Sequence, residues 1–190
     1  MRAGGEARRT IGVASDGSSV DVIDQTKLPR SLEIARLTTL DDACRAIRDM
    51  IVRGAPLIGV TAAYGLCLAL RDGASDEAIA LASTALAATR PTAVNLRWAL
   101  ERMQRVLAGV PISARLDAGY VEAAKIADED VAACRAIGEH GADLLERIYV
   151  ERGKPERLNI LTHCNAGWLA TVDWGTALAP VYVLARRGIP

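Results

Sequence analysis

Apolar and polar positions partly alternate near the start of the chain. Residues 20–24 and 31–36 show this period-two pattern, and residues 15–18 (Ser-Asp-Gly-Ser) are a turn signal between two short runs. We therefore expect a small β-sheet within residues 10–37.

From Thr39 onward, apolar residues recur at helical spacing. Thr39, Ser75 and Thr92 are suitable N-cap residues, because their hydroxyls can accept a hydrogen bond from a free N–H group of the first turn. Gly54 is expected to end the first helix and Pro56 to begin the second. The expected helices span residues 40–53, 56–70, 76–88, 93–107 and 117–148, and Val121 and Cys134 are expected to face inward on the last of them.

A polar, Gly- and Pro-containing connector at residues 151–156 separates this part from a second one. An apolar run at residues 158–162 predicts a strand, which a loop at residues 163–167 and a helix from about Thr176 to Arg187 follow. The predicted fold class is α/β, with a small N-terminal β-sheet and helical domain over 1–150. Residues 151–190 are then expected to begin a parallel α/β domain that is cut off, since one strand cannot make a sheet.

The composition excludes several classes of partner. The chain is 51% hydrophobic and 24% charged, with 23 basic and 23 acidic residues, so its formal net charge is zero. Nucleic-acid binding needs a concentrated basic face, and a polybasic membrane anchor needs a cluster of cations. We expect neither, and the charged N-terminus without an apolar run behind it indicates a cytoplasmic protein.

Two arginines immediately precede a helix start. Arg53-Gly54-Ala55-Pro56 joins two expected helices, so the N–H groups at the second helix start can bind an anion with help from the Arg53 charge. Arg90, before Pro91 and Thr92, repeats this arrangement. The alternative is that Gly54 and Pro56 only end and begin helices and that both arginines are solvated.

Cys164 is the cysteine with a chemical rationale. It follows the expected strand at 158–162, where open α/β sheets bind ligands and where helix N-termini can activate a thiol. A lone cysteine is also often a core residue, and we assign Cys44, Cys67 and Cys134 to the core. From these residues the chain is interpreted as a phosphate-binding α/β protein.

Five segments in order are more specific together than any one alone. They are residues 24–29 (Asp-Gln-Thr-Lys-Leu-Pro), 52–60 (Val-Arg-Gly-Ala-Pro-Leu-Ile-Gly-Val), 90–96 (Arg-Pro-Thr-Ala-Val-Asn-Leu), 160–167 (Ile-Leu-Thr-His-Cys-Asn-Ala-Gly) and 175–178 (Gly-Thr-Ala-Leu). This set closely resembles the methylthioribose-1-phosphate isomerase family of methionine salvage, over nearly the whole chain from about residue 20.

The resemblance implies isomerisation of 5-methylthioribose 1-phosphate to 5-methylthioribulose 1-phosphate without a metal or organic cofactor. It implies that Arg53, Gly54, Ala55 and Arg90 hold the phosphate and that Cys164 is catalytic. It also implies a Rossmann-like C-terminal domain and a homodimer. Hydrogen must move from C2 to C1 as a proton or as a hydride, and either route suits an acid/base pair in a water-poor pocket.

The family's catalytic aspartate and an Asn-Lys pair lie in the part of the C-terminal domain that follows these motifs. No aspartate within residues 1–190 matches that motif, so we expect little or no turnover by this chain alone. Two alternatives remain open. One is ribose-1,5-bisphosphate isomerase, and the other is a non-enzymatic regulatory subunit of the translation-initiation exchange factor.

Overall fold

The N-terminal region forms a small antiparallel sheet, as its alternating pattern predicts. The computed structural model describes residues 2–3 and 6–190. Strands β3 (Ile11–Val13), β4 (Val20–Ile23) and β5 (Ile34–Leu37) lie in the order β3-β4-β5, and a short pair, β1 (Arg2–Ala3) and β2 (Glu6–Ala7), precedes them. Val22 pairs with Ile11 and Ala35 and is buried. β5 begins at Ile34, three residues later than predicted, because Ser31 is part of a turn bonded to Lys27.

Helices account for most of the remaining chain. Their bounds are α1 (Leu40–Arg48), α2 (Ala55–Leu70), α3 (Asp76–Thr89), α4 (Val94–Ala108), α5 (Arg115–Glu151) and α6 (Ala179–Arg186), with short 3-10 turns η1 (Ile112–Ala114) and η2 (Trp168–Ala170). The five helices predicted before residue 151 are confirmed, with changes at their ends. α6 begins at Ala179, and Pro180 lies in its first turn, where a missing N–H group costs nothing.

The predicted caps are confirmed at two of three helices. Thr39 forms a capping box with Asp42, and the Ser75 side chain accepts a hydrogen bond from the Ala78 N–H group. Thr92 was the wrong residue for α4: Ala93 is the N-cap and offers no side-chain bond. The cause is a tight turn in which the Ala93 N–H group donates to the Arg90 carbonyl, so that Thr92 lies inside the turn.

Two further predictions along the helices were wrong. α1 ends at Arg48 rather than near residue 53, because Asp49 caps it and Met50 adopts a left-handed conformation with φ of 59°. On α5, Val121 is 68% exposed, and Glu122 and Ala123 are buried in its place.

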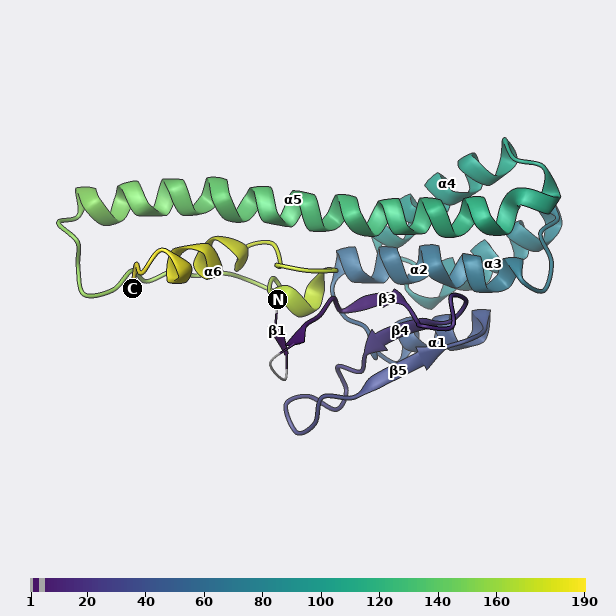
Figure 1. Cartoon of the computed structure of the whole chain (residues 1–190), viewed down its shortest axis with the longest axis horizontal. Coiled ribbons are helices and arrows are strands. Elements are labelled where there is room, and N and C mark those ends of the chain that lie inside the picture. The colour runs from purple at the N-terminus through teal and green to yellow at the C-terminus, as the bar shows by residue number, and fades with distance from the viewer. Residues whose placement is uncertain (1, 4–5) are drawn as a thin grey trace.

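Helix α2 is the centre of the molecule. Nearly all of its residues are buried, and α1, α3, α4 and α5 all pack against it (Figure 1). Small residues make this close approach possible: a Cβ atom at Gly59 would lie 2.8 Å from the Asn95 carbonyl oxygen, and one at Gly65 would lie 2.7 Å from the Ala43 Cβ. The sheet contributes Ile11, Val20 and Leu37 to the same core.

Helix α5 extends well beyond this core, and α6 lies along its C-terminal half (Figure 1). Gly138 and Gly141 on α5 allow Val183 and Pro180 of α6 to approach closely. Arg187, at the end of α6, adds ion pairs to Asp143 and Glu146 and to Glu139.

The strand predicted at residues 158–162 is absent from the described part of the chain. These residues are mostly exposed, and Leu161 is 99% exposed. A strand needs a neighbour whose N–H and C=O groups complete its ladder, and here one backbone bond, from the Leu158 N–H group to the Pro190 carbonyl, is formed. The apolar pattern is present, but no neighbouring strand among the described residues pairs with it.

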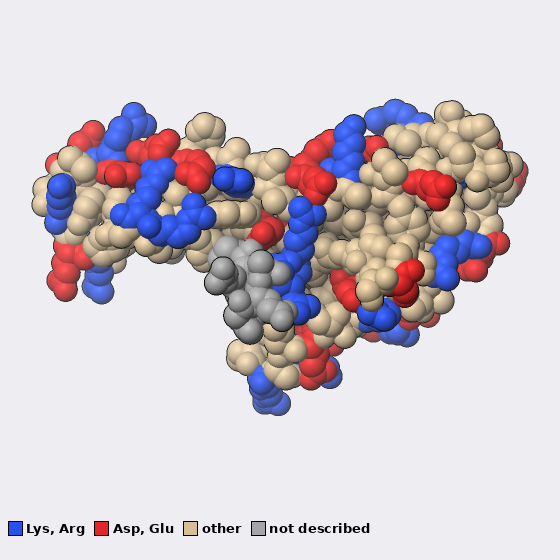
Figure 2. All heavy atoms as spheres, in the orientation of Figure 1, with Lys and Arg blue, Asp and Glu red and all other residues tan. Residues whose placement is uncertain are grey.

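Charges of both signs are interspersed on the face shown in Figure 2, over the α5–α6 end as well as over the larger body. Among the described residues, no helix is long and apolar enough to cross a membrane.

Candidate functional site

The segment before α2 presents a helix N-terminus that no side chain caps. Gly54 is the N-cap residue with φ of 105°, and Pro56 lies in the first turn. Arg53 and Ala55 are exposed beside it. Because the first N–H groups of a helix have no partner within the helix, this end can bind an anion. The uncapped helix start that the sequence interpretation of residues 53–55 requires is therefore present.

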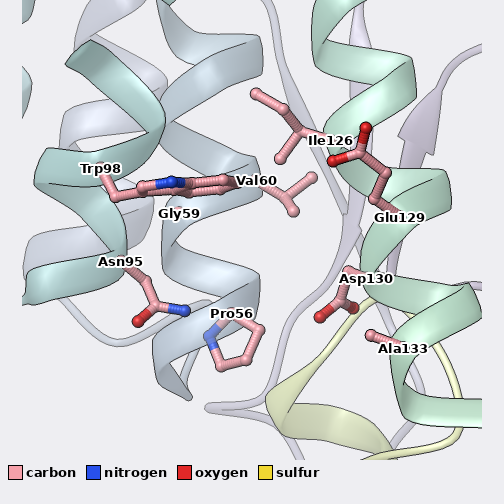
Figure 3. A pocket seen from close by; sticks show the side chains of 9 residues that line it. All are labelled: Pro56, Gly59, Val60, Asn95, Trp98, Ile126, Glu129, Asp130 and Ala133. Carbon is pink, nitrogen blue, oxygen red and sulfur yellow. The ribbon is translucent and has the colours of Figure 1, made fainter. Parts of the chain in front are cut away.

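The start of α4 lies beside the start of α2. Gly59, one turn into α2, packs directly on Asn95 of α4, and Pro56 and Asn95 line one pocket (Figure 3). Like α2, α4 has no side-chain cap. Arg90 is exposed and ends α3, and it lines a separate depression with Pro91 and Arg97. The structure thus brings the two helix starts together, and it leaves the Arg90 side chain outside the pocket that they share.

The segment that contains Cys164 doubles back on itself. Cys164 has φ of 66° and Trp174 has φ of 71°, in the left-handed region that residues other than glycine seldom adopt. The two ends of the segment touch, since a Cβ atom at Gly175 would lie 2.5 Å from the Gly167 carbonyl carbon. Ala166 accepts hydrogen bonds from the Thr176 and Leu178 N–H groups. Such clustered backbone strain is typical of functional sites.

The core assignment of three cysteines is confirmed, and the fourth, Cys164, is exposed. Cys44, Cys67 and Cys134 are buried, and Cys164 is exposed. Burial raises the pKa of Cys134 to about 12 and also raises the pKa of Cys44. The thiolate is the reactive form of cysteine, and a raised pKa disfavours it in Cys44 and Cys134. Cys164 is the one exposed thiol, so a ligand can reach it.

These two segments meet at Gly54. A Cβ atom at Gly54 would lie 2.4 Å from the Ala170 Cα atom, so the segment before α2 rests directly on η2. Only glycine can combine this contact with φ of 105°. The uncapped start of α2 and the segment that contains Cys164 are therefore in contact through Gly54 and Ala170.

Hydrogen bonds from the rest of the molecule hold residues 169–172. The Gln25 side chain donates to the Leu169 carbonyl at 2.7 Å, and the Thr10 hydroxyl donates to the Thr171 carbonyl at 2.6 Å. The Asp130 carboxylate accepts from the Val172 N–H group at 2.7 Å. Thr10 and Asp130 were missed by the sequence analysis. Gln25 lies in the segment 24–29, whose place among the five ordered segments was the signal available in the sequence, and the structure shows its side chain buried.

A pocket of about 220 Å³ opens between α2, α4 and α5 (Figure 3). Its lining combines an apolar wall with one amide and two carboxylates: Pro56, Gly59, Val60, Asn95, Trp98, Ile126, Glu129, Asp130 and Ala133. Burial raises the pKa of Asp130 above its usual value. Glu129 is paired with Arg102, whose guanidinium also bonds Glu122 and lies over the Trp98 ring at 5.4 Å.

Within the described residues, no group of three or more His, Cys, Asp or Glu side chains could hold a metal ion. What the site offers is a thiol, free helix N–H groups, exposed arginines and a partly buried carboxylate. These groups suit a small anionic ligand that undergoes acid/base chemistry.

The fold and the site define a class: an α/β protein whose helical core carries an uncapped helix start in contact with a segment that bears an exposed thiol. A comparison with protein families matches residues 51–186 to the initiation factor 2 subunit family. The chain belongs to that family.

The relatives in this family include enzymes and a translation factor. The chain is 62% identical over 190 residues to the methylthioribose-1-phosphate isomerase of Methylorubrum extorquens and 60% identical to that of Methylorubrum populi, covering 100% of the chain and 52% of each relative. The crystal structure of 5-methylthioribose 1-phosphate isomerase from Pyrococcus horikoshii matches 97% of the chain and 51% of its own, with a TM-score of 0.81 and 36% identity. The translation initiation factor eIF-2B subunit delta from A. fulgidus matches 96% of the chain and 52% of its own, with a TM-score of 0.79 and 38% identity. The chain thus spans about half the length of the relatives that it matches.

Proposed function

We propose that this chain supplies the phosphate-binding and thiol-bearing part of an aldose–ketose isomerase acting on 5-methylthioribose 1-phosphate. The observation that supports this most is the contact of Gly54 with Ala170, which brings the uncapped start of α2 to the segment that begins with Cys164. The relatives at 60% and 62% identity are named for this activity.

In this proposal the free N–H groups after Gly54 and the cations of Arg53 and Arg90 bind the substrate phosphate. Oriented N–H groups and guanidinium groups are both suited to phosphate oxygens. Cys164 then lies next to the reacting carbons. A phosphate on C1 blocks spontaneous ring opening, so the ring oxygen must be protonated before hydrogen moves from C2 to C1. Both the proton route and the hydride route are compatible with these residues.

The finer fold assignment is part of the same proposal. We infer that residues 1–150 are one domain and that residues 151–190 begin a Rossmann-like domain, in which 158–162 is the first strand. The bond from the Leu158 N–H group to the Pro190 carbonyl supports this, since it joins the expected strand to the chain four residues after the end of α6. A cytoplasmic homodimer belongs to the same proposal.

Thermal unfolding with saturating 5-methylthioribose 1-phosphate tests the proposed binding. Ligand at 100 times its dissociation constant adds about 2.7 kcal/mol to the free energy of unfolding, and each kcal/mol raises the midpoint of such a chain by roughly 2–4 °C. Arg53→Ala is expected to remove most of the shift. The matched control, Arg105→Ala, changes an exposed arginine near the far end of α4 and should keep the shift. An unchanged midpoint in the native chain would contradict the proposal.

We expect the chain by itself to bind this substrate with little or no turnover, because the family resemblance places the catalytic aspartate outside these residues. Turnover close to that of a relative of full length would contradict this part of the proposal.

The match to the translation factor subunit supports a second candidate function, a non-enzymatic regulatory subunit. A regulatory subunit acts by binding other proteins and does not need a reactive thiol. Retention of a complex with initiation-factor proteins in a pull-down, together with no effect of the sugar phosphate on unfolding, would favour this second function.

A further inference from the structure

Gln25 bonds to both of the segments that meet at Gly54 and Ala170. Its backbone N–H group donates to the Ile51 carbonyl at 2.9 Å, three residues before Gly54. Its side-chain amide donates to the Leu169 carbonyl at 2.7 Å, next to Ala170. The residue is 8% exposed, so water competes little for the side-chain bond. One buried glutamine therefore connects the chain that leads into α2 with η2.

The backbone of Gln25 is itself held in place on its N-terminal side. The Asp24 N–H group donates to the Glu33 carbonyl at 2.9 Å, which continues the pairing of β4 with β5 beyond Ile23. The Asp24 carboxylate accepts from the Thr26 N–H group at 2.9 Å and from the Thr26 hydroxyl at 2.6 Å. A side chain on such a fixed backbone can hold another group at a set distance.

Thr10 and Asp130 hold the next residues of the same segment from other elements. The Thr10 hydroxyl donates to the Thr171 carbonyl just before β3, and the Asp130 carboxylate on α5 accepts from the Val172 N–H group. The Gln25 bond differs from these two because the backbone of Gln25 is bonded to the chain that leads into α2. Gln25 is therefore the residue placed to set the distance between the two halves of the proposed site.

We propose that Gln25 is a positioning residue, which fixes the segment that contains Cys164 against the start of α2. Its consequence for binding rests on the proposed function, because it takes one substrate to reach from the helix start to Cys164. A ligand that contacts both segments binds more tightly when they are already held in the bound arrangement. A ligand that contacts the helix start alone gains nothing from this arrangement.

Dipolar EPR tests the positioning without any ligand. One spin label is attached to Cys164 and a second at Arg53→Cys, which is an exposed position, while the three buried cysteines should stay unlabelled. Gln25→Met keeps nearly the length of the side chain but cannot donate to the Leu169 carbonyl. We expect the distribution of label distances to widen or to shift relative to the chain with Gln25. Gln25→Leu also removes the amide and takes its place if Gln25→Met does not fold, and an unchanged distribution would overturn the proposal.

Ser75→Ala is the matched control. It removes one side-chain hydrogen bond, the cap of α3, so its effect on stability should be similar in size to the loss of the Gln25 bond. The label distances should stay as they are in the chain with Ser75. A change as large as that in Gln25→Met would show that any loss of stability loosens the segment, and it would overturn the specific role of Gln25.

Ligand binding tests the consequence for the site. The 190-residue chain is titrated with 5-methylthioribose 1-phosphate and with inorganic phosphate, and binding is followed by NMR. We expect Gln25→Met to weaken binding of the sugar phosphate about tenfold and binding of inorganic phosphate less than about twofold. A merely structural role would weaken both ligands alike, and that result would overturn the proposal.

The outcomes separate the role of Gln25 from the proposed function. Label distances that change in Gln25→Met, together with a native chain that binds neither ligand, overturn the proposed function, while the positioning of the segment by Gln25 stands. Label distances that do not change, together with a native chain that binds the sugar phosphate, overturn the role of Gln25, while the proposed function stands.

Discussion

The helical body (residues 10–131) and the C-terminal arm (residues 152–190) are built in different ways. The body has one large apolar cluster around α2, to which the sheet and α1, α3, α4 and α5 all contribute. A second, smaller apolar cluster joins the arm to α5. It contains three buried residues, Ala142 on α5 and Val183 and Leu184 on α6. The body can therefore fold on its own apolar surface, while the arm depends on the elements against which it lies.

The arm is held at one place more firmly than elsewhere. Residues 169–172 receive side-chain hydrogen bonds from Gln25, Thr10 and Asp130 of the body. The stretch before them, which includes Leu161 and Cys164, is exposed. The segment that carries the thiol is therefore anchored on the C-terminal side of Cys164, where Ala170 contacts Gly54 before α2, while the residues on its N-terminal side are mostly exposed.

The largest expected difference is in the free energy of unfolding after one leucine in each region is replaced by alanine. Leu66 is fully buried on α2, so Leu66→Ala leaves a cavity and should lower the free energy of unfolding by about 2–5 kcal/mol. Leu161 is 99% exposed, so Leu161→Ala should change it by less than about 0.5 kcal/mol. Urea unfolding of both variants measures the difference. Similar losses would mean that the arm has a core of its own.

The contact between the two regions is tested by Gly54→Ala. The new Cβ atom would meet the Ala170 backbone at 2.4 Å, and φ of 105° is unfavourable for alanine. Strain and overpacking together should cost about 2–4 kcal/mol. Gly153→Ala is the matched control, because its φ is also positive, at 76°, with no atom within 4 Å of the new Cβ. It should cost only about 1 kcal/mol, and equal losses in both variants would show that the Gly54 contact is not tight.

A smaller effect is expected within the body at Thr39. Its hydroxyl accepts from the Asp42 N–H group at 3.1 Å, and Asp42 returns a bond to the Thr39 N–H group. Thr39→Ala should lower the free energy of unfolding by about 1 kcal/mol, measured by the same urea titration. Thr39→Ser keeps the hydroxyl and should recover most of the loss; if it does not, the cap is not the cause.

Local patterns predicted the body better than the arm for a physical reason. Thr39 and Ser75 lie next to helices whose apolar spacing is regular, so cap and helix agree. Thr92 has the same chemistry, but the turn from Arg90 to Ala93 decides where α4 begins. The apolar pattern of 158–162 is correct for a strand, yet a strand forms only with a neighbour.

The sequence indicated which residues belong to the candidate site, but it did not indicate which of them lie close together. Gly54 and Cys164 stand out as a helix start and an isolated thiol, while the Gly54–Ala170 contact joins residues more than a hundred positions apart. Asp130 is one of several acidic residues on α5. Its hydrogen bond to the Val172 N–H group becomes visible only when the arm lies against α5.

Alkylation of Cys164 tests most directly whether the start of α2 and the thiol segment form one site. Iodoacetamide at pH 8, followed by peptide mass spectrometry, should modify Cys164 and spare the three buried thiols, since burial raises the pKa of Cys134 to about 12. With saturating 5-methylthioribose 1-phosphate we expect modification of Cys164 to slow at least about tenfold. In Arg53→Ala the same ligand concentration should leave the rate unchanged. An unchanged rate in the native chain, under conditions where the ligand raises its unfolding midpoint, would show that the phosphate site and Cys164 do not share a substrate.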